Sequence, residues 1–225
     1  MISSENDQRR PGRPKSLEKQ AAIRQAAADM FLSVGWEGTS MDAVAAAAGV
    51  SKQTVYSHFR SKDDLFRACV RSKKELYQLE VDPSAQPDLA TGLARFARSL
   101  LELLRDPEVM AMYRLLVAHC MDFPKLVRNF HEAGPEAGLE TVRRLLLHFE
   151  PEVFANQADA AACDFIAQVH HRFFAELLLA LRPTIDDGEI REHVERSVRL
   201  FRRAYGIDAA GNGDAGGRAH GRSDA

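Results

Sequence analysis

The 225-residue sequence has few of the features that mark specialised classes of protein. Its three cysteines, Cys69, Cys120 and Cys163, include no CxxC pair, which argues against a disulfide scaffold and favours a reducing compartment. The most apolar stretches, 43–50 and 177–181, are far shorter than the roughly 20 residues of a membrane-spanning helix. The polar first 15 residues lack the apolar core of a signal peptide. We therefore expect a cytoplasmic protein without a membrane segment.

An excess of charge of one sign is also missing, because 30 Lys and Arg residues stand against 32 Asp and Glu residues. The net charge by itself therefore predicts no polyanionic partner. The charge is unevenly distributed, however. Residues 1–75 hold 13 basic and 9 acidic residues, whereas the remainder holds 17 and 23. This asymmetry suggests that the first part meets a polyanion, and a chance excess on a solvated face is the alternative.

Alternating runs of β-branched residues are absent, and apolar residues recur three and four positions apart instead. Ile23, Ala27 and Phe31 begin this pattern, which predicts a helix over 16–34 that ends at Gly35. Similar spacing predicts helices near 88–105, 107–121, 135–149, 159–181 and 187–205, with prolines at or near their boundaries. The predicted fold class is therefore all-α.

The two ends of the chain lack this periodicity. Residues 9–15, RRPGRPK, combine three helix breakers with like charges, so residues 1–15 are expected to form a disordered basic arm. Residues 206–225 contain six glycines and no apolar pattern. Ordering them would cost more entropy than burial could return, so we expect a disordered tail.

Residues 38–59 read as two short helices joined by a tight turn. Ser40 and Ser51 are placed to cap these helices, because each hydroxyl can accept an N–H that the first turn leaves unpaired. Gly49 lies where the first helix needs a positive φ to end. Small alanines allow the close approach of a helix-turn-helix. An ordinary helical hairpin is the alternative, but the caps, the turn glycine, the basic flank and the polar face all agree with a helix-turn-helix.

The second of these helices has the size that fits the major groove of DNA, where side chains of its first turns reach base edges. The residues on the face not needed for packing are Lys52, Gln53, Thr54 and Ser57, which suit base or phosphate contacts, while Tyr56, His58 and Lys62 suit phosphates. Ser61 and Asp64 are placed to form a capping box that opens the next helix. The predicted partner is therefore double-stranded DNA.

Taken together, residues 10–75 resemble the TetR family of transcriptional regulators. The matching pieces are GRPK, VGWEGTSM at 34–41, AGVS at 48–51, TVYSHF at 54–59 and SKDDLF at 61–66. The resemblance implies a homodimer whose three-helix heads, residues 16–62, bind an inverted-repeat operator. It also implies that a larger C-terminal helical domain, residues 63–205, holds an effector pocket and the dimer interface.

The resemblance also carries residue roles to matching positions. The implied base-facing residues are Gln53, Thr54 and Ser57, and the implied contacts to the DNA backbone are Ser40, Tyr56, His58 and Lys62. Asp42 departs from the pattern, since some members place a basic DNA contact there. We expect Asp42 to face away from DNA or to serve the N-terminus of its helix.

The second half, between residues 113 and 135, is similar to the C-terminal domain of an AefR-like subgroup, which implies an effector-responsive domain. A dimer is most simply built from two helices of each chain, and those near 159–181 and 187–205 are the candidates. Their candidate interface residues are Phe165, Ile166, Phe173, Phe174, Leu177, Val194, Val198 and Phe201. The alternative is that these side chains face only their own core.

A cavity between the helices would suit a small, mostly apolar effector. The residues expected to line it are Phe96, Leu100, Met112, Leu116, His119, Phe123, Val169 and Phe173, each of which could instead be plain core. No cofactor or metal is expected, since adjacent residues such as His170 and His171 point about 100° apart on a helix. Among the thiols, Cys69 is expected to be the least inert because it lies between two arginines, and Cys120 and Cys163 are expected to be buried.

Two other functions compete with an effector-gated repressor. A helical enzyme could use His119, His170 or Glu176 as acid and base, although the sequence has no nucleophile elbow, phosphate loop or spaced set of metal ligands. An architectural DNA-binding protein would bind DNA broadly and without an effector. The sequence favours a regulator that is not an enzyme.

Overall fold

The structure, a computed structural model, describes residues 13–207, with side chains from residue 17 onward. The expectations for most of the basic arm and of the tail, at 1–12 and 208–225, lie outside these residues. The described chain is helical throughout and contains no strand, which confirms the all-α fold. Within 13–207, no helix combines the length and the apolar character needed to cross a bilayer.

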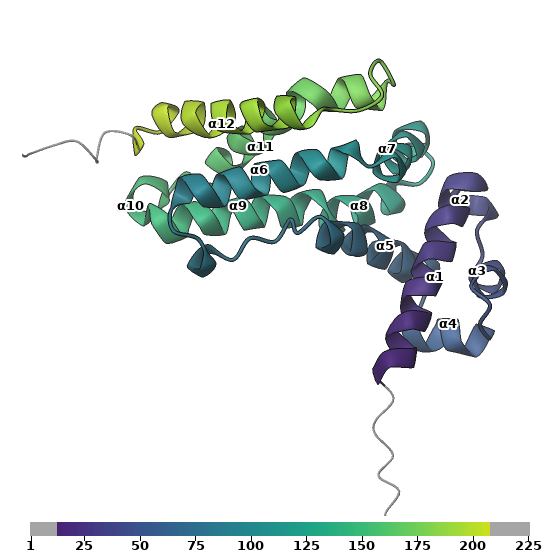
Figure 1. Ribbon diagram of the computed structural model, residues 1–225. Helices are drawn as coiled ribbons and strands as arrows, with labels where there is room; N and C mark the ends of the chain where they lie inside the picture. The colour runs from purple at the N-terminus through teal and green to yellow at the C-terminus, as the bar shows by residue number, and fades with distance from the viewer. Residues whose placement is uncertain (1–12, 208–225) are drawn as a thin grey trace, which may run out of the picture.

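The head is formed by α1 to α4, with α5 leading away from it. In chain order these helices are α1 Arg13–Ser33, α2 Gly35–Gly38, α3 Met41–Ala47, α4 Lys52–His58 and α5 Lys62–Leu76. Figure 1 shows α1 as a long upright helix, with α3 and α4 beside it on the outer side. Buried Ile23, Phe31, Val44, Val55 and Phe66 join α1, α3, α4 and α5 in one apolar cluster.

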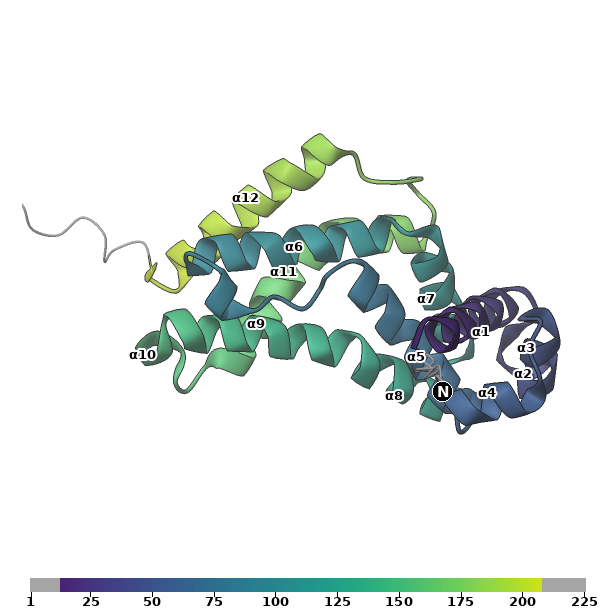
Figure 2. The same ribbon diagram turned by 60° about the horizontal axis from the view of Figure 1, so that its bottom comes forward.

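The C-terminal domain is a set of long helices packed lengthwise. Its elements are the 3-10 turn η1 Pro83–Ala85 and α6 Leu89–Arg105, α7 Pro107–His119, α8 Pro124–Ala133, α9 Pro135–Phe149, α10 Pro151–Phe154, α11 Ala158–Leu178 and α12 Asp187–Ala204. Figures 1 and 2 show α6 between α12 and α9, with α11 behind them. Phe154, Phe165 and Phe201 are fully or almost fully buried at the centre of a second apolar cluster.

The predicted helices lie close to their ranges, but several boundaries differ and some helices were not predicted. α1 begins at Arg13 rather than at residue 16, which is possible because Pro14 falls in the first turn, where its missing N–H costs nothing. α8 and the short helices α2 and α10 were not predicted as separate helices. Ile207, assigned from sequence to the tail, is half-buried and packs against the C-terminal core.

Candidate functional site

Local hydrogen bonds build the helix-turn-helix as predicted. The Ser40 hydroxyl accepts the backbone N–H of Ala43 at 3.1 Å, and the Ser51 hydroxyl accepts that of Thr54 at 3.1 Å. Gly49 has a φ of +65°, a conformation that L side chains rarely adopt, and α3 ends just before it. The predictions of both caps and of the turn glycine are confirmed.

α4 turns one face into the head and the other to solvent. Val55 and Phe59 are buried in the head cluster, whereas Gln53 and Ser57 are exposed and Tyr56 has 52% of its area exposed. Figures 1 and 2 place α4 on the side of the molecule away from α12. The C-terminal domain therefore leaves this polar face open.

The polar side chains of α4 differ in how firmly they are held. The hydroxyls of Ser51 and Thr54 lie 2.8 Å apart, and Ser57 donates to the Thr54 carbonyl at 2.8 Å. His58 is half-buried beside the Phe59 ring. None of the described residues hydrogen-bonds to the side chain of Gln53, so among the base-facing candidates its amide is the most free to find an external partner.

Asp42 and Lys52 form an ion pair, with 2.5 Å between carboxylate and ammonium. Asp42 lies in the first turn of α3, where the helix dipole favours an acid, which agrees with one of the two places expected for it. Both side chains are more than half exposed, so water screens the pair and it can exchange partners easily. Lys52 is thus a cation that Asp42 holds beside the polar face of α4.

Lys62 lies differently from the phosphate contact predicted for it. Its ammonium donates to the carbonyls of Trp36 at 2.7 Å and Thr39 at 2.9 Å, and it lies 4.5 Å from the centre of the Trp36 ring. Burial lowers the pKa of this ammonium, with nearby Asp63 and Glu37 acting in the opposite direction. Lys62 therefore ties the α2 region to the start of α5, because the carbonyls that end α2 need a donor.

This link was not predicted, because it depends on an aromatic cluster between residues that are far apart in the sequence. Trp36 stacks on Phe31 with centroids 5.4 Å apart, and both rings meet the Phe66 ring edge-on. The sequence feature that could have indicated this cluster is Trp36, the only tryptophan of the chain, which lies between Gly35 and Gly38. At the start of α5, Ser61 caps as predicted by accepting the N–H of Asp64, whose carboxylate binds the Arg60 N–H rather than that of Ser61.

The three thiols are distributed in the opposite way to the prediction. Cys69 is buried and donates to the carbonyl of Arg24 at 3.4 Å, and burial raises its pKa to about 12. Cys120 and Cys163 are exposed. The two arginines flanking Cys69 in sequence do not activate it, because residues two positions apart on a helix point away from each other.

A cavity of about 610 Å³ lies where α1 and α5 meet the C-terminal helices. Its lining is mostly apolar, as a small-molecule site requires. Phe96, Leu100 and Met112 line it as predicted. Further lining residues that were not predicted include Val109, Tyr113, Phe130, Ile166, His170 and Phe174.

The other five predicted lining residues lie elsewhere. Val169 and Phe173 are fully buried in the C-terminal core, and Leu116 and Phe123 pack in the head-side cluster. His119 is exposed at the end of α7. On α11 the cavity is lined by His170 and Phe174, which directly follow Val169 and Phe173 in the sequence. Each step along a helix turns the side chain by about 100°, so these residues face a different direction.

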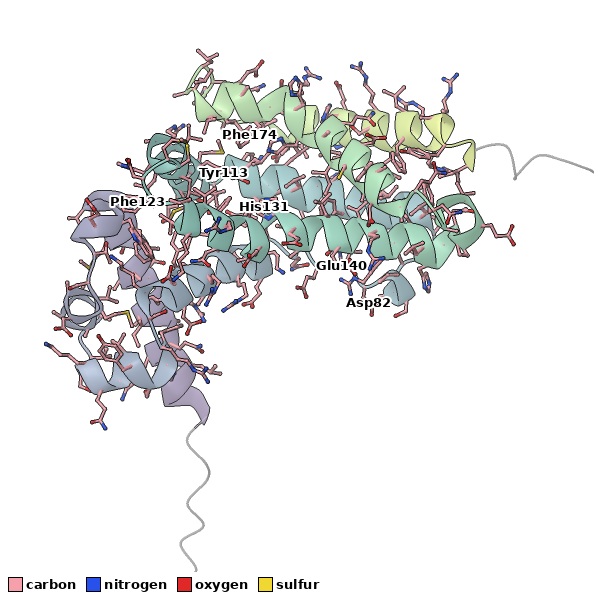
Figure 3. The ribbon with its side chains drawn as sticks, turned by 180° about the vertical axis from the view of Figure 1, so that it is seen from behind. Asp82, Tyr113, Phe123, His131, Glu140 and Phe174 are labelled. Carbon is pink, nitrogen blue, oxygen red and sulfur yellow. The ribbon has the colours of Figure 1, made fainter. Side chains whose placement is uncertain are left out.

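Aromatic and polar groups meet at the α7 and α11 walls of the cavity. The Tyr113 ring meets the rings of Phe130 and Phe174 edge-on, each with centroids 4.9 Å apart, and His170 stacks on Phe174 at 4.1 Å. Figure 3 shows Tyr113 and Phe174 side by side. Burial raises the pKa of Tyr113 to about 12 and lowers that of His170 to about 4, with His171 adding to the latter. Both side chains are therefore uncharged near pH 7.

The proposed interface residues of α11 and α12 lie mainly in the chain's own core. Six of them are buried without a partner chain: Phe165, Phe173, Leu177, Val194, Val198 and Phe201. Ile166 and Phe174 are half-buried and line the cavity. For the six buried side chains the alternative, a place in their own core, is correct, because α11 and α12 pack on each other and on α6 and α9 within one chain.

Two polar junctions fasten α5 to the C-terminal domain. Toward its end, Lys73 lies 2.7 Å from both Asp106 and Glu108 at the start of α7, and these acids raise the pKa of Lys73 against the effect of burial. Near its start, Asp63 accepts from Asn129 of α8 at 2.8 Å, and Asn129 accepts from Arg67 at 3.0 Å. α5 therefore links the head to the walls of the cavity through polar contacts at both of its ends.

The residues weighed for metal binding or acid–base chemistry have separate surroundings. His170 lines the cavity, while His171 is exposed on the next position of α11. Glu176 pairs with Arg182 at 3.3 Å, and His119 lies 3.7 Å from Asp122. Across residues 13–207, no group of three His, Cys, Asp or Glu side chains is placed to hold a metal ion.

Comparisons with known proteins agree with this architecture. Residues 23–69 match the model of bacterial regulatory proteins of the tetR family, and residues 91–207 match that of the AefR-like transcriptional repressor C-terminal domain. The regulator SrpR of Pseudomonas putida is 23% identical over 131 residues, covering 58% of this chain and 61% of its own length. The chain thus spans less than two thirds of that relative.

Two solved structures are similar over most of both chains. A Mesorhizobium loti protein described as a TetR-family transcriptional regulator has a TM-score of 0.67 and 28% identity, and the match covers 85% of this chain and 98% of that one. The flavonoid-responsive regulator FrrA has a TM-score of 0.65 and 30% identity, covering 83% and 96%. Proteins of this family are transcriptional regulators rather than enzymes. The capped helix-turn-helix, the helical C-terminal domain and both family matches therefore show that the chain belongs to the TetR family of DNA-binding transcriptional regulators, with an AefR-like C-terminal domain.

Proposed function

We propose that this DNA-binding regulator is a ligand-responsive repressor, located in the cytoplasm, that binds an inverted-repeat operator as a homodimer. The main support for this proposal is that one chain combines an open polar face on α4 with a separate apolar cavity. Helix α5 follows α4 in the chain and contributes to the lining of the cavity. A two-fold dimer would present two α4 helices related by symmetry, which matches the symmetry of an inverted repeat. The match to a repressor C-terminal domain supports repression as the outcome.

The chemistry of the cavity supports an aromatic effector. Rings of Phe96, Tyr113, Phe130 and Phe174 surround the space, and such rings favour edge-on or offset contacts with another ring. A cavity of about 610 Å³ lies within the usual range for drug-sized ligands. FrrA, one of the similar structures, is named as responsive to flavonoids, which are aromatic compounds of this size.

Dimerisation is proposed to use the outer faces of α11 and α12 and the adjoining end of α7. Large apolar side chains that are more than half exposed occur on α7 and just after α7 and α11: Val117 on α7, Met121 after α7, and Leu179 and Leu181 after α11. Arg114 joins these elements by donating to the carbonyls of Leu177 and Leu178. Apolar patches of this kind mark interaction sites, and a second copy is the partner that this family typically uses.

A gel-shift titration tests the proposal. The purified protein is expected to prefer an inverted repeat upstream of its own or a neighbouring gene over random duplex, and a flavone is expected to weaken that complex. Equal binding to both duplexes would contradict the operator proposal. A clear preference that no aromatic compound changes would favour DNA binding without an effector instead.

A further inference from the structure

The cavity crosses the boundary between the head and the C-terminal domain. α1 of the head contributes Arg24, Ala28 and Leu32 to its lining, and α11 contributes His170 and Phe174. A ligand that filled the cavity would therefore touch α1 and α11 at once. Its binding would depend directly on how the head sits against the C-terminal domain.

The charged groups of the lining are neutralised within the chain, with one exception. Lys73 pairs with Asp106 and with Glu108, which itself lines the cavity, and Lys74 pairs with Glu80 at 2.9 Å. Arg24 is half-buried, yet no side chain of the described part of the chain hydrogen-bonds or ion-pairs with its guanidinium. Burial raises the pKa of the neighbouring Cys69, and the positive charge of Arg24 acts in the opposite direction.

An unpaired guanidinium beside an apolar cavity has an energetic consequence. Partial removal of a cation from water is costly unless an anion compensates, and a carboxylate or similar acid binds the planar fork of arginine with two hydrogen bonds. The walls formed by α7 and α11 supply uncharged aromatic groups, including Tyr113 and His170. The cavity is thus lined by one unpaired cation, Arg24, and by several aromatic rings.

We propose that the cavity binds an aromatic acid, with the acidic group at Arg24 of α1 and the rings between α7 and α11, so that the ligand bridges the two domains. This inference rests on the proposed ligand response and specifies its chemistry. The acid contacts the head itself, so effector binding changes the position of α1 without a relay through α5. The ion pair forms only when α1 stands at the correct distance from α11, and by linkage the ligand favours that arrangement of the head.

A matched pair of fluorescent probes separates charge recognition from apolar binding. 8-Anilinonaphthalene-1-sulfonate carries an acidic group, and N-phenyl-1-naphthylamine has the same ring system without it. Arg24→Gln in the full-length protein is expected to weaken binding of the sulfonate about tenfold, the value of one charge-assisted hydrogen bond, and binding of the amine less than about twofold. Arg24→Lys, which keeps the charge but not the planar fork, is expected to retain an affinity for the sulfonate between those of the wild type and Arg24→Gln.

Two control variants test whether the effect of Arg24→Gln is specific to the cavity and whether the probes bind in the cavity at all. Arg71→Gln removes the same charge from an exposed position of α5 outside the cavity and is expected to change neither affinity. Ile166→Trp fills the cavity and is expected to weaken both probes. Equal loss of both probes in Arg24→Gln, or loss of neither, would overturn the acid site while leaving the cavity in place. Unchanged binding of both probes to Ile166→Trp would reject the cavity as a ligand site, and the proposed ligand response with it.

Discussion

The head and the C-terminal domain use their apolar residues in different ways. In the head, Phe31 and Val55 are completely buried, and the polar edge of α4 is left outside. In the C-terminal domain, α11 packs Phe173 into a closed core and turns the adjacent Phe174 toward a cavity. Neighbouring residues of the same type therefore have different roles there. The comparison shows that short-range caps and turns define the DNA-binding surface, whereas long-range packing defines the ligand site.

The largest expected effect compares these two neighbouring phenylalanines. Phe173→Ala removes a fully buried ring and is expected to lower the free energy of unfolding by about 3–5 kcal/mol. Phe174→Ala enlarges an existing cavity and is expected to cost about 1–2 kcal/mol, while weakening binding of an aromatic probe. Urea unfolding followed by circular dichroism measures both. Equal losses of stability would show that α11 has no such division between core and cavity.

Two lysines of the head provide the next comparison. Lys62→Met leaves the carbonyls of Trp36 and Thr39 without their donor and is expected to lower the free energy of unfolding by about 1–3 kcal/mol. Lys52→Met removes an exposed ion pair and is expected to change stability by less than about 0.5 kcal/mol. Thermal unfolding of the two variants measures the difference. A stable Lys62→Met variant with weakened DNA binding would restore the phosphate role predicted for Lys62.

Gln53 tests whether the open face of α4 reads base sequence. Gln53→Ala is expected to weaken operator binding by about 1–3 kcal/mol, because a direct amide contact to a base edge is lost, and to leave affinity for random duplex unchanged. Gln157→Ala, an exposed substitution at the start of α11, is the matched control. Fluorescence anisotropy with both duplexes measures the effect. Parallel losses on the two duplexes would assign Gln53 to the DNA backbone instead.

The smallest expected effect concerns the Asp42 carboxylate. Asp42→Asn removes a negative charge beside α4 and frees Lys52, so affinity for operator and random duplex is expected to rise together by up to about 1 kcal/mol at low salt. The gain is expected to shrink at high salt, where exposed charges are screened. Glu152→Gln, at an exposed position of α10, changes the net charge equally and serves as the control. An equal gain from Glu152→Gln would attribute the effect to net charge alone.

Sequence reasoning was most successful where a structural feature depends on a few adjacent residues. The two serine caps, the positive φ of Gly49 and the outward direction of Gln53 all follow from hydrogen bonding or helical periodicity within one or two turns. The ranges of the long helices follow from the same periodicity and from the prolines near their ends. α8 was not predicted, although it begins at Pro124 and its apolar residues Leu126, Phe130 and Ala133 recur at helical spacing.

The wrong predictions of cavity-lining residues on α11 share one cause, which is that this helix is apolar on several faces. Val169, His170, Phe173 and Phe174 can all be read as lining or as core, and only the packing of α7 and α9 against α11 separates them. The exposure of Cys163 and the burial of Cys69 depend in the same way on which helices lie opposite. The phosphate contact of Lys62 stays a prediction, and only the folded structure shows that its ammonium lies over the ring of Trp36, 26 residues away.

The amino-acid sequence by itself determined the all-α class, the helix-turn-helix and the polar edge that it presents, because these depend on backbone hydrogen bonding and periodicity within short segments. Tertiary structure alone decided that Lys62 stabilises the head, that α11 divides its aromatic residues between core and cavity, and that Arg24 of α1 belongs to the cavity wall. The reason is geometric. A helix presents its side chains in every direction, and only its neighbours determine which of those directions are filled, open or charged.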